Sequence, residues 1–240
     1  MVEDEFETEE IESQSILVTG ASSGIGFELC QYLLDAGHFV IGVSRSGNEF
    51  LNDNYLDLRL DLREESAVDE IVEVLEEQVY GLHMVVNCVG FFEMSSVEEL
   101  TSESFMDHLQ TNVMGVFHTL KGVENYLIEN DSHVITLSSL AAKKGLPHFS
   151  AYCSSKAAVE RLIESVREEW KEYGLRFTTL MPGPMDTPLW DELTKTDSDF
   201  DRGQMLEAQD FLHVFVMLFN SPKSVQFPEI HFAHRAGVLE

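Results

Sequence analysis

The chain has 240 residues, 44% of them hydrophobic, which is typical of one globular domain. Its formal net charge is −28, and no stretch concentrates the 15 basic residues, so we expect neither nucleic acid nor an anionic membrane as a partner. No apolar run approaches the roughly 20 residues of a membrane helix, and the acidic N-terminus lacks the positive region of a signal peptide. These features predict a cytoplasmic protein.

The strong acidity allows two interpretations. It favours solubility through self-repulsion, and it is also typical of proteins adapted to high salt, where ions screen that repulsion. The acids are densest in residues 3–12, where seven of the ten are Asp or Glu. Such a block repels itself, so residues 1–13 are predicted to form a flexible acidic tail.

Cysteine and histidine spacing predicts neither a disulfide framework nor a metal site. Cys30, Cys88 and Cys153 are odd in number and far apart, which favours reduced thiols. The nine histidines show no HExxH-type spacing.

From Ser15 onward, short apolar runs alternate with longer segments of helical period. The predicted strands are 16–19, 39–43, 55–60, 83–89, 133–138, 176–181 and 229–232. The predicted helices are 24–36, 66–79, 104–129, 152–172 and 210–219. This alternation predicts an α/β fold with a single doubly wound (Rossmann-type) parallel sheet, helices on both faces, and a ligand at the carboxyl ends of the strands. Residues 14–240 are predicted to form one domain, with a substrate loop around 184–209.

A glycine-rich turn joins the first predicted strand to the first predicted helix. It reads Thr19-Gly20-Ala21-Ser22-Ser23-Gly24-Ile25-Gly26. Glycines let backbone approach a pyrophosphate closely, and the helix N-terminus supplies N–H donors. Any tight turn of this kind favours glycine, so it is the position between strand and helix that strengthens the prediction.

Five motifs in order resemble those of the short-chain dehydrogenase/reductase family, over roughly residues 15–190. They are Gly20-x-x-x-Gly24-x-Gly26, Asn87-Cys88-Val89-Gly90, Asn112 in its predicted helix, Ser139 followed thirteen residues later by Tyr152-x-x-x-Lys156, and Pro182-Gly183 with Thr187. Cys88 and Val89 depart from the family's Asn-Ala, which puts the packing there in question. Beyond Thr187 the resemblance fades.

The chemistry of the Tyr-Lys pair also follows from its spacing. Tyr152 and Lys156 are four apart on a predicted helix and share a face, so the ammonium is expected to lower the tyrosine pKa. Tyr152 can then give its proton to a carbonyl oxygen, which Ser139 can hydrogen-bond as charge develops. The resemblance implies that Lys156 also holds the nicotinamide ribose. It further implies that Asn112 lies in a kinked helix and links to Lys156 through a water.

The resemblance implies a nicotinamide cofactor, and the end of the second strand indicates which one. Ser44 stands where NAD-preferring relatives carry Asp, and Arg45 can neutralise the 2′-phosphate of NADP(H), with Ser22 nearby. Asp61-Leu62 resembles the pair that contacts adenine. The expected cofactor-binding residues are Gly20, Ser22, Ser23, Gly24, Ile25, Gly26, Ser44, Arg45, Asp61, Leu62, Asn87, Gly90, Tyr152, Lys156, Pro182, Gly183 and Thr187.

These motifs predict an NADPH-dependent oxidoreductase that reduces a small apolar ketone or aldehyde to an alcohol, reversibly. A ketoacyl-carrier or thioester reductase is one alternative, although the acidic loop at 191–201 would repel an acidic carrier. A non-catalytic cofactor-binding regulator is another. Several apolar residues could line a substrate pocket or belong to the core, namely Phe91, Phe92, Met94, Phe149, Met185, Leu189 and Trp190. The apolar faces of the helices predicted at 104–129 and 152–172 favour a homodimer or homotetramer.

Overall fold

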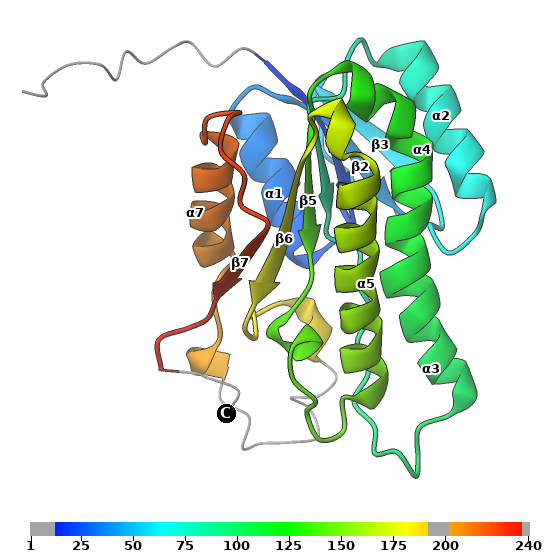
Figure 1. Ribbon diagram of the computed structural model, residues 1–240, viewed down its shortest axis with the longest axis vertical. Helices are drawn as coiled ribbons and strands as arrows, with labels where there is room; N and C mark the ends of the chain where they lie inside the picture. Colours follow the sequence, from blue (N-terminus) through cyan, green and yellow to red (C-terminus); the bar gives the residue numbers. More distant parts are fainter. Residues whose placement is uncertain (1–12, 192–201, 237–240) are drawn as a thin grey trace, which may run out of the picture.

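The computed structural model describes residues 13–191 and 202–236. Seven parallel strands in these ranges form one sheet in the order β3-β2-β1-β4-β5-β6-β7 (Figure 1). The strands are β1 (Ser15–Thr19), β2 (Phe39–Ser44), β3 (Tyr55–Arg59), β4 (Met84–Asn87), β5 (His133–Leu137), β6 (Arg176–Pro182) and β7 (Glu229–Phe232). The predicted doubly wound sheet is confirmed. The acidic tail predicted for residues 1–13 lies outside the described residues except for Ser13.

Burial on both faces explains the composition of the central strands. Ile16, Leu17 and Val18 of β1 are fully buried, because helices cover both sides of the sheet. β7 is the edge strand and exposes Glu229 and His231, so it carries little hydrophobic signal in the sequence.

Helices form a layer on each face of the sheet (Figure 1). α1 (Gly24–Asp35) and α7 (Ala208–Phe219) pack on one face, and α2 (Ser66–Gln78), α4 (Gly115–Glu129) and α5 (Ser150–Glu169) pack on the other. Gly122 lets α4 approach α2 closely, since a Cβ there would lie 2.9 Å from Ile71. None of the helices in the described ranges is long and apolar enough to cross a membrane.

The segment predicted as one helix over 104–129 is interrupted. α3 (Ser102–Leu109) leads into a π-helical turn over Gln110–Met114, and α4 follows. Asn112 lies in this turn, where its buried side chain accepts a hydrogen bond from the Phe91 amide at 2.6 Å. Hydrophobic periodicity does not reveal a turn widened in this way, although the family resemblance implied an irregularity at Asn112.

The strand order also determines where a ligand can bind. β1 pairs with β2 on one side and with β4 on the other, so the connections that leave the carboxyl ends of β1 and β4 diverge. In doubly wound sheets such a switch point opens a crevice. The arrows of β5, β6 and β7 point towards the lower part of the view in Figure 1.

Candidate active site

A cavity of about 260 Å³ lies at the carboxyl ends of the strands. The structure brings together there most of the residues that the five motifs predicted. Those on its wall are Gly20, Ser22, Ser23, Gly24, Ile25, Gly26, Ser44, Arg45, Asp61, Leu62, Gly90, Ser139, Tyr152, Lys156, Pro182, Gly183 and Thr187.

The glycine-rich turn forms a site suited to an anion. Gly20 has a φ of +70°, and a Cβ there would lie 3.0 Å from backbone atoms of Cys88, so glycine is required. Ser23, the N-cap of α1, makes no side-chain capping hydrogen bond, and the first turn of α1 contains no acidic residue. The amides and the positive dipole end of α1 are therefore available to a pyrophosphate at the cavity wall.

The departure from the family pattern at Cys88-Val89 is accommodated by the neighbouring helix. A Cβ on Gly115, the first residue of α4, would lie 3.3 Å from the Val89 side chain. The absent side chain of Gly115 thus makes room for the larger valine. Cys88 lies on the cavity wall, and burial raises the pKa of its thiol to about 12.

Basic residues gather at the end of the cavity near β2 and β3. The Ser44 hydroxyl, which is buried, accepts a hydrogen bond from the Gly47 amide at 3.0 Å. Arg45 is exposed, and no hydrogen bond or ion pair joins it to another residue in the ranges that the structure describes. Its guanidinium is free to meet a phosphate. This arrangement fits the role predicted for Arg45.

Sequence reasoning missed Arg63, which also lines the cavity. Arg63 binds both carboxylate oxygens of Asp61, with Nη2 2.6 Å from Oδ2. This hydrogen bonding, aided by Arg45, holds the pKa of Asp61 below its usual range. Asp61 is one of the two residues expected to contact adenine, and its carboxylate is already bound by Arg63. The only signal in the sequence was a basic residue directly after Asp61-Leu62.

The serine and tyrosine of the predicted catalytic set line the same cavity. Ser139 follows β5 and caps the short 3₁₀ turn Leu140–Ala142, where its Oγ accepts from the Ala141 amide at 3.1 Å. Tyr152 lies in the first turn of α5, which begins at Ser150 and thus two residues before the predicted start. The Ser139 hydroxyl lies near enough to Tyr152 to oppose the rise in the pKa of the phenol.

The expected lowering of the tyrosine pKa by Lys156 is wrong in this structure. Burial raises the pKa of Tyr152 to about 12, and the nearby Ser139 hydroxyl opposes this only in part. The reason lies in the direction of the lysine: Lys156 Nζ donates to the Leu137 carbonyl at 3.0 Å and lies 5.8 Å from the centre of the tyrosine ring. Burial also lowers the pKa of Lys156 to about 8.

Two predicted asparagines do not lie on the cavity wall. Asn112 donates to the Phe91 carbonyl at 3.0 Å and to Ser155 Oγ at 2.8 Å, so both Nδ2 hydrogens are used within the protein. It joins the loop after β4 to α5. Asn87 is fully buried and donates to Thr136 Oγ1 on β5 at 3.2 Å. The role of Asn87 in cofactor binding stays a prediction.

Aromatic rings pack beside Tyr152 at the other end of the cavity. The Phe92 ring lies 4.9 Å from those of Phe149 and Tyr152 and 5.1 Å from that of Trp190, between ring centres. Seven apolar residues were expected either to line a substrate pocket or to belong to the core. Met94 is exposed, and the other six line the cavity. Phe92 and Trp190 also pack with Met205 in a small core, so both interpretations hold for them.

Arg202 holds the described part of the predicted substrate loop together. Its guanidinium bonds to Asp186 Oδ1 at 2.6 Å, Asp191 Oδ1 at 2.8 Å and the Thr187 carbonyl at 3.1 Å. The backbone adds a bond from the Asp186 amide to the Leu206 carbonyl at 2.8 Å. The predicted loop spans 184–209, and its residues 192–201 lie outside the described residues. Sequence reasoning counted the acids of this loop and missed the cation that binds two of them.

The chain is similar to known proteins over most of its length. An uncharacterized oxidoreductase of Staphylococcus epidermidis is 26% identical over 227 residues, which are 92% of this chain and 96% of that protein. A 3-amino-tetrahydro-pyrrolizinone reductase of Xenorhabdus hominickii is 27% identical over 208 residues, or 83% of this chain and 73% of that one.

One similar solved structure is an alcohol dehydrogenase of the archaeon Thermococcus sibiricus complexed with 5-hydroxy-NADP. Its TM-score is 0.83 at 24% sequence identity, and the match covers 95% of this chain and 100% of that one. The closed form of a serine dehydrogenase complexed with NADP+ has a TM-score of 0.84 at 21% identity, with 94% and 96% covered. Both of these structures have the same fold as this chain. The family model for short chain dehydrogenases matches residues 14–198, most of the chain, and the protein therefore belongs to the short chain dehydrogenase family.

Proposed function

We propose that the protein is an NADPH-dependent oxidoreductase that reduces a ketone or aldehyde to an alcohol, and that oxidises the alcohol in the reverse direction. The observation that carries this proposal is that Tyr152 and Ser139 lie on the wall of a cavity that also contains the glycine-rich turn. A proton donor and an anion-binding turn thus share one cavity.

The residues at the cavity fit a nicotinamide dinucleotide phosphate. The uncapped N-terminus of α1 suits its pyrophosphate, and Arg45 suits its 2′-phosphate. By family resemblance Lys156 holds the nicotinamide ribose, and Leu62 lies near the adenine. When bound, the nicotinamide supplies the hydride. The Thermococcus sibiricus alcohol dehydrogenase is complexed with 5-hydroxy-NADP and the serine dehydrogenase with NADP+, which supports this choice of cofactor.

The proposed chemistry of the protein's own residues is a proton transfer. Tyr152 gives its phenolic proton to the carbonyl oxygen of the substrate, and Ser139 donates a hydrogen bond to the same oxygen as negative charge develops. A tyrosine pKa of about 12 keeps the phenol protonated at neutral pH, which favours the reduction direction. Alcohol oxidation would need the phenolate and should therefore be faster at alkaline pH.

The aromatic wall supports an apolar carbonyl compound as substrate. The cavity residues around Tyr152 include Phe91, Phe92, Phe149 and Trp190, and rings of this kind favour an apolar group beside the reacting carbonyl. The Xenorhabdus hominickii relative carries the name of a reductase, which is consistent with this reaction class. Asp186 and Asp191 both pair with Arg202, which offsets much of the repulsion that these two carboxylates would exert on the acidic carrier of a ketoacyl reductase.

The decisive experiment measures NADPH consumption with a panel of aromatic and aliphatic ketones and aldehydes. Turnover of apolar carbonyls that Tyr152→Phe abolishes is the expected result. Turnover of an acetoacetyl thioester alone would establish the carrier reductase instead. Tight NADPH binding without turnover of any compound would favour the regulator.

A further inference from the structure

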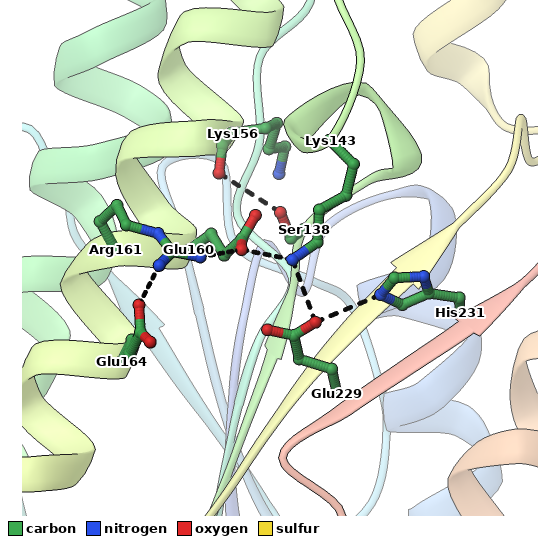
Figure 2. A network of polar contacts seen from close by, with 8 residues as sticks. All are labelled: Ser138, Lys143, Lys156, Glu160, Arg161, Glu164, Glu229 and His231. Atoms are coloured by element: carbon green, nitrogen blue, oxygen red, sulfur yellow. Dashed lines mark hydrogen bonds and ion pairs between the residues drawn. The ribbon is translucent and has the colours of Figure 1, made fainter.

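A group of charged side chains joins the segment after β5 to helix α5 and strand β7 (Figure 2). Lys143 Nζ lies 2.5 Å from Glu160 Oε1 and 3.0 Å from Glu229 Oε2. Arg161 also pairs with Glu160 and with Glu164. Lys143, Glu160 and Glu229 do not line the cavity, and the proposed reaction assigns them no role.

The position of Lys143 links this group to Ser139. Lys143 ends the 3₁₀ turn that Ser139 begins, and its amide donates to the Leu140 carbonyl at 3.0 Å. The Ala142 amide donates to the Ser139 carbonyl at the same distance. A displacement of the Lys143 end of this compact turn would therefore move Ser139 as well.

The position of Glu160 links the group to Tyr152 and Lys156, which lie on the same helix. Glu160 follows Lys156 by four residues on α5, so the two side chains share a face one turn apart. Its side chain is 5% exposed. The ion pair with Lys143 thus bridges the two segments that must meet for Ser139 to contact Tyr152.

Burial gives this bridge a defined geometry. A buried carboxylate is costly unless cations and hydrogen-bond donors compensate it, which leaves Glu160 few alternative arrangements. An exposed pair on the same helix, such as Glu164 with Arg161, has no comparable constraint. The hydrogen bond with Glu160 also raises the pKa of Lys143, so the lysine stays charged at neutral pH.

We propose that Lys143 and Glu160 form a positioning pair that holds Ser139 in hydrogen-bond contact with Tyr152 during catalysis. The inference rests on the proposed function. It assigns the pair no contact with substrate or cofactor, and it places its effect on the proton-transfer step alone. Misplacement by about 1 Å can cost an enzyme up to roughly a hundredfold in rate, so the loss of one ion pair in this bridge should be measurable in kcat.

The test compares Lys143→Met and Glu160→Gln with a rescue variant and a matched control. Both variants should fold, because Glu160 keeps Arg161 in the first and Lys143 keeps Glu229 in the second. We expect kcat to fall about tenfold in each, with the KM for the carbonyl and the Kd for NADPH within about twofold of wild type. Lys143→Arg should restore most of kcat. Glu164→Gln, the same change one turn along α5, should leave it unchanged.

Hydrogen–deuterium exchange at the amides of Ala141, Ala142 and Lys143 supplies a readout that does not need turnover. Exchange there should be faster in Lys143→Met and Glu160→Gln than in wild type and Glu164→Gln. Wild-type kcat together with wild-type exchange in Lys143→Met, or a Lys143→Arg protein as slow as Lys143→Met, would overturn the proposal. If Glu160→Gln does not fold, Lys143→Met alone decides. If the wild type turns over no carbonyl, the proposed function fails and the exchange result still decides whether the pair positions this turn.

Discussion

Lys156 directs its ammonium group at the backbone carbonyl of Leu137, 3.0 Å away, and not at the hydroxyl of Tyr152. Leu137 ends β5, two residues before Ser139, so the lysine is anchored to the strand that delivers the serine. Burial of this amine lowers its pKa to about 8. The fold therefore contains a lysine whose charge is unfavourable, and this has a measurable consequence for stability.

Replacing Lys156 with Met should stabilise the fold near neutral pH. Below pH 8 the folded protein carries the buried charge, and the shift of the lysine pKa from 10.5 to about 8 corresponds to about 3 kcal/mol. Loss of the bond to Leu137 offsets part of this, so we expect Lys156→Met to be more stable by about 1–2 kcal/mol at pH 7.

The pH dependence has a definite sign. Between about pH 8 and 10.5 the unfolded chain binds a proton at Lys156 that the folded protein has released, so the wild type gains stability as pH rises. The advantage of Lys156→Met should shrink across this window, as measured by urea unfolding of both proteins at several pH values. A stability difference that stays constant with pH would show that Lys156 does not titrate in this range.

Tyr152→Phe should abolish most of the activity without loss of fold or of NADPH binding. The substitution removes only the phenolic hydroxyl, which lies near Ser139. General acid catalysis is worth roughly 10²–10⁴-fold, so kcat should fall at least a hundredfold. Tyr80→Phe removes a hydroxyl from a fully exposed side chain and serves as the control. Retention of more than about a tenth of the rate by Tyr152→Phe would exclude it as the acid.

The sequence predicted the positions that depend on topology. Ser44, Ser139 and Pro182 come at or just after strand ends, and parallel strands bring such ends to one edge, so their meeting at one cavity follows from the strand order alone. The predicted strand and helix boundaries differ from the observed ones by at most three residues, because hydrophobic periodicity does not register the last hydrogen bond of an element.

Features set by the direction of single side chains were not predictable. The spacing of Tyr152 and Lys156 placed them on one face. It did not show that the lysine bonds to Leu137 or that burial raises the pKa of the tyrosine. Arg63 and Arg202 have no motif, and their partners are known only once the loops are folded. The π-helical turn at Asn112 likewise depends on a tertiary bond to Phe91.

Arg202 should control the affinity for the carbonyl substrate. It binds the segment that carries Trp190 through Asp186, Asp191 and the Thr187 carbonyl, so its loss should loosen that wall of the cavity. We expect Arg202→Met to raise the carbonyl KM about tenfold, and Arg202→Lys to recover only part because an ammonium lacks the planar fork of donors. Steady-state kinetics measure this. An unchanged KM in Arg202→Met would remove the segment from substrate binding.

We also expect the protein to form a homodimer or homotetramer. Met106 on α3 is 48% exposed and Phe117 on α4 is 37% exposed, and large apolar side chains at such positions favour burial against another copy. Light scattering should give a mass of at least twice the 27.2 kDa of the chain. Phe117→Glu should shift the population towards monomer. Particles of one chain only at micromolar concentration would refute the prediction.

The cofactor should be NADP(H), with Arg45 as the main determinant of the preference. Arg45 lies on the cavity wall without a described ion-pair partner, while the neighbouring arginine Arg63 is held by Asp61. A charged hydrogen bond to the 2′-phosphate implies a preference of roughly ten- to hundredfold. Arg45→Ala should therefore raise the KM for NADPH by about this factor and leave the KM for NADH nearly unchanged.

Arg59 provides the matched control, because it is also exposed at a strand end but pairs with Asp57 and does not line the cavity. Arg59→Ala should change neither KM. Ser44→Asp together with Arg45→Ala should invert the preference, since a carboxylate at position 44 accepts a hydrogen bond from a ribose hydroxyl and repels a phosphate. The Gly47 amide, which now donates to the Ser44 hydroxyl, can donate to the new carboxylate. If the unmodified enzyme uses NADH as well as NADPH, or if Arg45→Ala weakens both equally, Arg45 does not select the cofactor.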